Sequence, residues 1–150
     1  MAACRDDGGG TLKTIPYQPN VFAFFYNKDL FEQAGIEEVP TTFDQWTEAA
    51  EKISALSTAE NPIYGSGLFY CYNGQNQSVI QRFGTDYMIT GNEEDGFEAN
   101  LLDNQAFADA MIWMKNLYDN GYNPQETDID SMMAAGQIGL MTNGGWLKGT

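Results

Sequence analysis

The stretch FFYNKDLFEQAGI, residues 24–36, changes character twice within a few positions. It begins inside an apolar run that starts at residue 21, which is typical of a strand buried on both faces of an α/β sheet. Asn27 then supplies a good helix N-cap, and Gly35 can take the left-handed conformation that ends a helix. The side chains expected on the buried side of this short helix are Leu30, Phe31 and Ala34. The stretch therefore predicts a strand, a capped turn and a short helix.

Helices and strands keep alternating along the rest of the chain. Thr42 with Gln45 three residues later fits a capping box and predicts a helix over about 43–57. Asn104 caps the clearest helical pattern, about 105–119. Its predicted buried stripe is Phe107, Ala110, Met111, Met114, Leu117 and Tyr118. The remaining predictions are a strand near 63–70, a helix at roughly 74–84, a short hairpin or irregular strands in the acidic segment 91–104, a short helix from Asp130, and a strand at 138–142. This alternation argues for an α/β layered domain.

Composition and charge narrow the classes of partner. The chain has 150 residues, which suits one domain, and its formal net charge is −14 from 21 acidic and 7 basic residues. Such a charge repels nucleic acid and anionic lipid surfaces, and it favours a neutral or cationic ligand over a phosphorylated one. An acidic surface that only keeps the protein soluble is an equally good explanation. No apolar run is long enough to predict a membrane span.

Catalytic and metal chemistry has little support. The chain has no histidine, which removes Ser-His-Asp and Cys-His arrangements, and nothing in the spacing of Cys4 and Cys71 supports a metal site or a disulfide. The acidic residues 93–95 fail the calcium-loop pattern, and Gly65-Ser66-Gly67 is interpreted as packing rather than a phosphate cradle. We therefore predict no cofactor, no metal and no catalytic residue, although spacing alone does not exclude a carboxylate pair.

Aromatic and amide side chains gather at the predicted loop ends. Flat aromatic faces and uncharged amides together suit a neutral polyhydroxylated ligand such as a sugar. Each of these residues taken singly is more often explained by packing than by ligand contact. The group consists of Tyr17, Gln18, Tyr70, Tyr72, Asn73, Gln75, Asn76, Asn143 and Trp146.

Two motif blocks resemble one protein family. IPYQPN at 15–20, YNKDLFEQAG at 26–35 and PTTFDQW at 40–46 stand in the order and spacing of the extracellular solute-binding proteins of bacterial ABC importers, in the sugar-binding family similar to maltose-binding protein. WMKNLYDNGY at 113–122 and SMMAAGQIGLMTNGGW at 131–146 resemble a second block of that family, with Ala-Gly-Gln in place of its usual Phe-x-x-Gly-Lys.

The resemblance implies a type II periplasmic-binding-protein-like fold, of which this chain would be one incomplete, helix-rich lobe. Residues 1–11 would be a flexible leader, and 12–150 most of the C-terminal lobe. Cys4 would not be the lipid-attachment cysteine, because that residue would precede the missing N-terminal lobe. The ligand-binding residues implied are Trp146, Tyr70, Tyr72, Asn73, Tyr17 and Asn143, whereas the YNK corner is structural.

The function implied is that of a substrate-binding component that closes over a carbohydrate and delivers it to a membrane permease outside the cytoplasm, without breaking a bond. The full-length protein would lie in the periplasm or be lipid-anchored at the cell surface. Two alternatives stay open: a carbohydrate-processing enzyme domain, which needs two carboxylates across a cleft, and a non-catalytic interaction domain, whose aromatic residues would be buried in the core.

Overall fold

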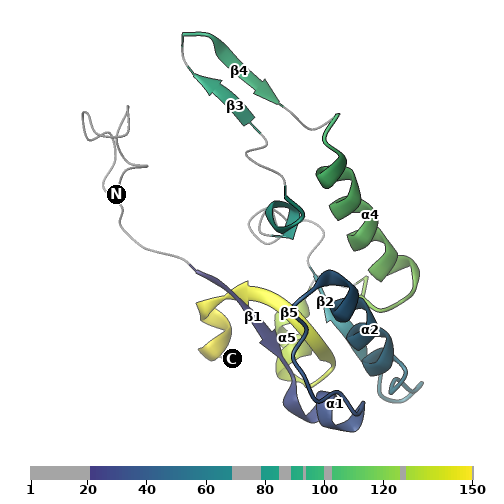
Figure 1. Ribbon diagram of the computed structural model, residues 1–150. Coiled ribbons are helices and arrows are strands. Elements are labelled where there is room, and N and C mark those ends of the chain that lie inside the picture. Colours follow the sequence, from purple (N-terminus) through teal and green to yellow (C-terminus); the bar gives the residue numbers. More distant parts are fainter. Residues whose placement is uncertain are drawn as a thin grey trace.

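The computed structural model describes residues 21–68, 79–84, 89–92, 94–99, 103–125 and 128–149 (Figure 1). The helices and strands are β1 (Phe22–Tyr26), α1 (Lys28–Gln33), α2 (Phe43–Ser54), β2 (Tyr64–Gly67), β3 (Ile89–Asn92), β4 (Gly96–Ala99), α4 (Gln105–Asp119), α5 (Ile129–Ala134), β5 (Ile138–Gly144) and the 3₁₀ helix η2 (Gly145–Gly149). Residues 79–82 are also helical. The alternation of helices and strands is the layered α/β arrangement that the sequence predicts.

Strand β5 lies in the middle of a three-stranded sheet with the order β1-β5-β2. It pairs antiparallel with β1 and parallel with β2, and all of its residues are buried. Successive side chains of β5 join different core clusters, because Leu140 packs in the cluster that contains α2 and Met141 in the one that contains α5. Helices α2 and α5 therefore cover opposite faces of the sheet.

The opening stretch forms the predicted strand, capped turn and short helix, but the prediction that the strand is buried on both faces is wrong. Strand β1 lies at the edge of the described three-stranded sheet, and Val21 and Ala23 are exposed. The Asn27 side-chain oxygen accepts hydrogen bonds from the backbone N–H groups of Asp29 (3.0 Å) and Leu30 (3.2 Å), which caps α1. Gly35 follows the helix with φ +66°, in the left-handed region. Leu30 and Phe31 are buried. The corner is thus a local structural device.

Helix α2 begins at the predicted capping box and ends earlier than predicted. Thr42 accepts a hydrogen bond from Gln45 N–H, and the Gln45 side chain accepts one from Thr42 N–H. The helix ends at Ser54 and not near residue 57. The Ser54 hydroxyl accepts a hydrogen bond from Gly65 N–H (2.8 Å), so the end of α2 is tied to the start of β2.

The two glycines of β2 are explained by packing, as predicted. A Cβ on Gly65 would lie 2.0 Å from the backbone oxygen of Ala50 in α2. A Cβ on Gly67 would lie 2.7 Å from a methyl group of Ile129 in α5. The Ser66 hydroxyl between them is buried and accepts a hydrogen bond from Trp46 Nε1. The strand ends at Gly67, short of the predicted 63–70, of which positions 69 and 70 lie outside the described residues.

Helix α4 matches its predicted range, and its predicted buried stripe is correct except at one residue; Phe107 and Tyr118 are half-buried. Ala110, Met114 and Leu117 are buried, whereas Met111 is 45% exposed, so its prediction as a core residue is wrong. The indole of Trp113 takes the inward side, where its ring lies 4.7 Å from that of Phe43. A large aromatic side chain buries more apolar surface than methionine, which favours Trp113 over Met111 at the edge of the buried face.

The remaining elements agree with the predictions except at their ends. The acidic segment holds a hairpin of β3 and β4, although β3 starts at Ile89, ahead of the predicted segment. Helix α5 begins at Ile129 and is capped by Asp128, not started by Asp130. Strand β5 continues to Gly144, two residues past its predicted end. In the predicted helix 74–84, positions 74–78 lie outside the described residues, and Val79 and Ile80 are buried.

Candidate functional site

Trp146 lies directly after the carboxyl end of β5, in η2, and 45% of its surface is exposed. Its ring meets that of Phe22 edge to face, with the ring centroids 5.9 Å apart and the planes at 85°. Phe22 stands opposite Gly144 in the pairing of β1 and β5. The indole is therefore fixed against the sheet on one side and open to solvent on the other, which leaves an aromatic surface available for contact.

Gly144 decides where this indole lies. A Cβ at position 144 would lie 2.0 Å from Cζ3 and 2.2 Å from Cη2 of Trp146. Carbon atoms in contact normally lie about 3.5–4.0 Å apart, so no larger residue fits below the ring. The next glycine, Gly145, would place its Cβ in open space. The glycine at 144 thus allows the indole to fold back over the strand.

Asn143 lies in the same strand end but is used by the protein itself. It is 3% exposed, its amide nitrogen donates to the carboxylate of Asp130, and its oxygen accepts a hydrogen bond from Gly144 N–H (2.8 Å). The bond to Asp130 holds the strand end to α5. The assignment of Asn143 as a ligand contact stays a prediction, and its position assigns it a supporting role next to Trp146.

The other predicted ligand-binding residues lie outside the described part of the chain. They are Tyr17, Tyr70, Tyr72 and Asn73. Of the predicted ligand-binding residues, the structure therefore describes Trp146 and Asn143.

A cavity of about 550 Å³ opens on the same side of the sheet as Trp146, although Trp146 itself does not line it. Phe24 in β1 lines it and pairs with Thr142 of β5, which lines it too. Phe22, the partner of Trp146, is two residues from Phe24, so both side chains point to one face of the sheet. Two residues along a strand span about 7 Å, so the cavity and the indole are close neighbours.

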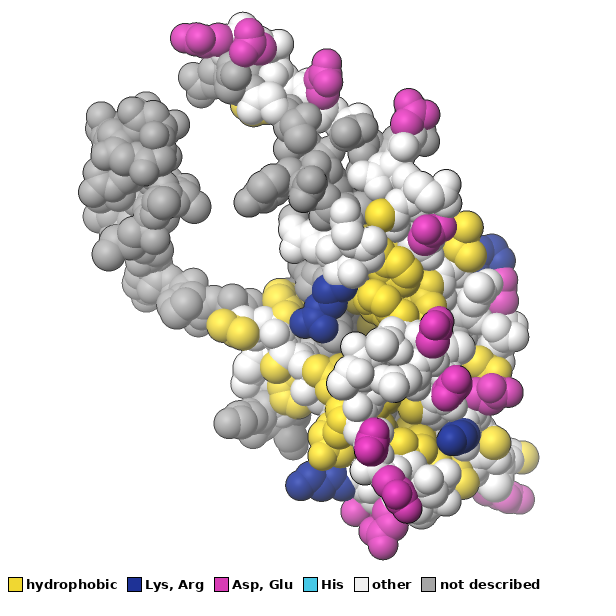
Figure 2. Space-filling model, viewed as in Figure 1, with side chains coloured by type: hydrophobic (Ala, Val, Ile, Leu, Met, Phe, Trp, Pro, Cys, Tyr) yellow, Lys and Arg dark blue, Asp and Glu magenta, His cyan; other side chains and the backbone are white. Residues whose placement is uncertain are grey.

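The start of α2 forms the opposite wall of this cavity. Its lining residues are Phe24, Pro40, Thr41, Thr42, Phe43, Trp46, Val79, Arg82 and Thr142. The ring of Trp46 meets Phe24 edge to face at 5.0 Å, and its Nε1–H donates to Ser66 Oγ (3.2 Å). Figure 2 shows hydrophobic side chains gathered on this face, with a basic side chain beside them and acidic ones around. This cavity was not predicted from the sequence, because its residues come from four segments that meet only in the folded chain.

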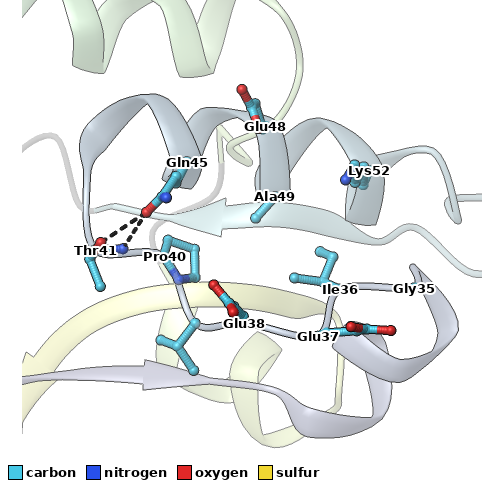
Figure 3. A pocket seen from close by; sticks show the side chains of 11 residues that line it. Gly35, Ile36, Glu37, Glu38, Pro40, Thr41, Gln45, Glu48, Ala49 and Lys52 are labelled. Carbon is cyan, nitrogen blue, oxygen red and sulfur yellow. Dashed lines mark hydrogen bonds between the residues drawn. The ribbon is translucent and has the colours of Figure 1, made fainter.

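Two further cavities lie near the 35–40 loop. One, of about 350 Å³, runs between this loop and α2 (Figure 3). Gln45 Oε1 accepts hydrogen bonds there from Thr41 N–H (2.9 Å) and Oγ1–H (3.0 Å). Its charged lining residues are Glu37, Glu38, Glu48 and Lys52. Among the described residues that line this cavity none is aromatic, so they offer no stacking surface for a sugar.

Among the described residues, one titratable group has a shifted pKa. In the described part of the chain, no three Cys, Asp or Glu side chains are grouped so as to hold a metal ion. Burial, with the nearby carboxylate of Glu51 and its hydrogen bond, raises the pKa of the Tyr122 phenol. The described helices include none that is long and apolar enough to span a membrane.

Comparison with known proteins identifies the family. The family model described as "Bacterial extracellular solute-binding protein" matches residues 2–147. A protein of Brucella abortus (strain 2308), named as a binding protein, is 29% identical over 154 aligned positions that cover 93% of this chain and 34% of that protein. The sn-glycerol-3-phosphate-binding periplasmic protein UgpB of Agrobacterium fabrum is 24% identical and is matched over 89% of this chain and 31% of its own length.

The fold agrees with this assignment. The sugar-binding protein MalE from Xanthomonas citri superposes with a TM-score of 0.70 at 20% identity, over 92% of this chain and 34% of that one. It is a periplasmic-binding-protein type II fold, which the resemblance implied. The chain spans about a third of the length of the relatives that it matches. The family match over nearly the whole chain shows that it belongs to the bacterial extracellular solute-binding proteins.

Proposed function

We propose that this chain provides one side of a carbohydrate site in the substrate-binding component of an ABC importer. A second lobe would close over the sugar and the complex would deliver it to a membrane permease outside the cytoplasm. The observation that carries the proposal is the half-exposed indole of Trp146, which is held over Gly144 at the end of the central strand. A sugar ring presents C–H patches that pack on such a face.

The names of the relatives support a hydroxyl-rich ligand. MalE of Xanthomonas citri is named as sugar-binding and UgpB of Agrobacterium fabrum as sn-glycerol-3-phosphate-binding. At such low identity neither substrate is transferred to this chain. A hydroxyl-rich ligand, the class common to both names, supports the predicted ligand-binding set, which consists of Trp146, Tyr70, Tyr72, Asn73, Tyr17 and Asn143.

We infer a role in binding without catalysis. A glycosidase needs two carboxyl groups about 5–9.5 Å apart across its cleft. No carboxylate appears among the described residues that line the cavity beside Trp146. An interaction domain that buries its aromatic residues would not leave Trp146 45% exposed. Both alternatives are therefore less well supported than ligand binding.

The test is a titration of the 150-residue chain with neutral mono- and disaccharides, followed by NMR of the indole N–H groups. One side of the site makes only part of the contacts, so we expect Kd at about millimolar or weaker. The Trp146 signal should shift, and Trp146→Ala should abolish binding. Met111→Ala, a residue with the same 45% exposure on α4, serves as the control and should change nothing. If no sugar shifts the Trp146 signal, the proposal is refuted.

A further inference from the structure

The cavity beside Trp146 differs in charge from the rest of the molecule. The chain carries 21 acidic and 7 basic residues. Nevertheless Arg82 is the one charged residue among the described residues that line this cavity. The other two cavities contain carboxylates, contributed by Glu37, Glu38 and Glu48 in one and by Glu32 and Glu37 in the other. The cavity next to the proposed sugar site is therefore the basic one.

Arg82 is placed to bind an acidic group. Its side chain is exposed at the cavity, and within the described residues no carboxylate forms an ion pair with it. A guanidinium stays charged at all ordinary pH values, and its planar fork of N–H donors matches a carboxylate or phosphate with two parallel hydrogen bonds. Such a pair is stronger than a hydrogen bond to a neutral hydroxyl. Arg82 is thus a free anion-binding group in this part of the chain.

The other walls suit the carbon skeleton of such a ligand. Phe24, Phe43 and Trp46 contribute aromatic surface, and Thr142 contributes a side chain from β5. The cap of α2 is already satisfied by Thr42 and its partner Gln45, so we assign no ligand contact to that helix end. The described lining of the cavity therefore combines apolar area with the cation of Arg82.

We propose that this cavity binds the acidic group, carboxylate or phosphate, of an acidic sugar or polyol, with Arg82 as its partner. The inference rests on the proposed function, because the sugar ring of the same ligand would lie against Trp146. It departs from the neutral or cationic ligand that the net charge of −14 favours. Salt screens charges more than about 8–10 Å away, so the cation at the cavity outweighs the distant carboxylates in setting specificity.

The experiment uses the 150-residue chain with nitrogen-15 in its arginine and tryptophan side chains. Only two arginines, Arg5 and Arg82, and three tryptophans, at 46, 113 and 146, contribute signals. Glucuronate, glucose 6-phosphate and glucose are titrated in parallel, so that carboxylate, phosphate and neutral sugar are compared on one skeleton. We expect both acidic sugars to shift the Arg82 and Trp46 signals and to bind at least about tenfold more tightly than glucose, a difference of about 1.4 kcal/mol.

Matched variants assign the effect to Arg82. Arg82→Gln should remove the preference for acidic sugars, and Arg82→Lys, which keeps the charge without the planar fork, should retain only part of it. Lys52→Gln removes one positive charge from another cavity and should leave the preference intact. If only one of the two acidic sugars binds, that sugar shows whether the cavity takes a carboxylate or a phosphate.

Three results would overturn the inference: glucose binding as tightly as the acids, an acid preference that survives in Arg82→Gln, or acidic sugars that leave the Arg82 signal unmoved at their highest soluble concentration. If glucose shifts Trp146 in any of these cases, the proposed function stands and only the acidic ligand is refuted. If the acids shift Arg82 while no sugar shifts Trp146, the cavity is an anion site and the proposed function fails.

Discussion

Replacement of Gly144 by alanine tests whether the sheet positions the indole of Trp146. The new Cβ would lie 2.0–2.4 Å from three ring carbons, whereas ordinary contact is about 3.5–4.0 Å. The ring must therefore move by roughly 1.5 Å or more, and its edge contact with Phe22 is lost. An aromatic pair contributes about 0.5–1.5 kcal/mol beyond its buried area. We expect a loss of about 1 kcal/mol, which lowers the melting temperature of a chain of this size by about 2–4 °C.

Sugar binding should suffer more than stability, because Trp146 is 45% exposed and contributes little to the core. A displaced indole presents its face in the wrong direction, and we expect at least about a tenfold rise in Kd. Calorimetry gives the melting temperature, and NMR of the indole N–H groups reports the ring and the sugar titration. Gly145→Ala is the matched control, since its Cβ meets no atom of the described residues within 4 Å. If Gly144→Ala leaves the Trp146 signal and the melting temperature unchanged, the ring does not depend on Gly144 and the reasoning is wrong.

Three further predictions concern the core and its pH dependence. Thr42→Ala removes the cap of α2 and should cost about 0.5–2 kcal/mol, measured by urea unfolding; an unchanged midpoint would contradict the cap. Gly65→Ala drives a Cβ into the backbone of Ala50 and should cost about 1–3 kcal/mol or prevent folding, and a normal melting curve would refute this close approach. The raised pKa of Tyr122 means that the folded state holds this proton more tightly, so its stabilising effect is complete below about pH 10 and is lost as the pH rises through the folded pKa. Tyr122→Phe should therefore lose less stability than the parent chain between about pH 8 and 11, and equal losses would contradict the assignment.

Signals that act within a few residues were reliable guides to this fold. The caps Asn27, Thr42 and Asn104 each accept the expected backbone hydrogen bond, and Gly35 has its left-handed conformation. A cap needs only a side chain and the next turn of backbone, so the sequence contains everything that determines it. These three caps correctly predicted where α1, α2 and α4 begin.

Helix ends and faces depended on partners that are distant in sequence. Helix α2 stops where the Ser54 hydroxyl bonds to Gly65 N–H, eleven residues later. In α4, Trp113 lies on the inward side, where its Nε1–H donates to Thr47 Oγ1 (2.9 Å), 66 positions earlier in the chain. Hydrophobic periodicity counts Met111 and Trp113 as equal candidates, because it carries no information about the space that each side chain must fill.

The candidate site also depends on contacts between residues that are distant in sequence. The strand FAFFY was predicted as core on its apolar character, and Phe25 does pack in the core cluster around α5. Of its alternate residues, Phe22 supports Trp146, and Phe24 packs against the other core cluster and also lines the adjoining cavity. Nothing in the strand distinguishes these roles, because they follow from its pairing with Gly144 and Thr142 near the end of β5. A one-residue shift in that pairing would turn both aromatic side chains to the other face of the sheet. The register of β1 against β5 is therefore what joins the fold to the proposed site, and a substitution that disturbs it should impair stability and binding together.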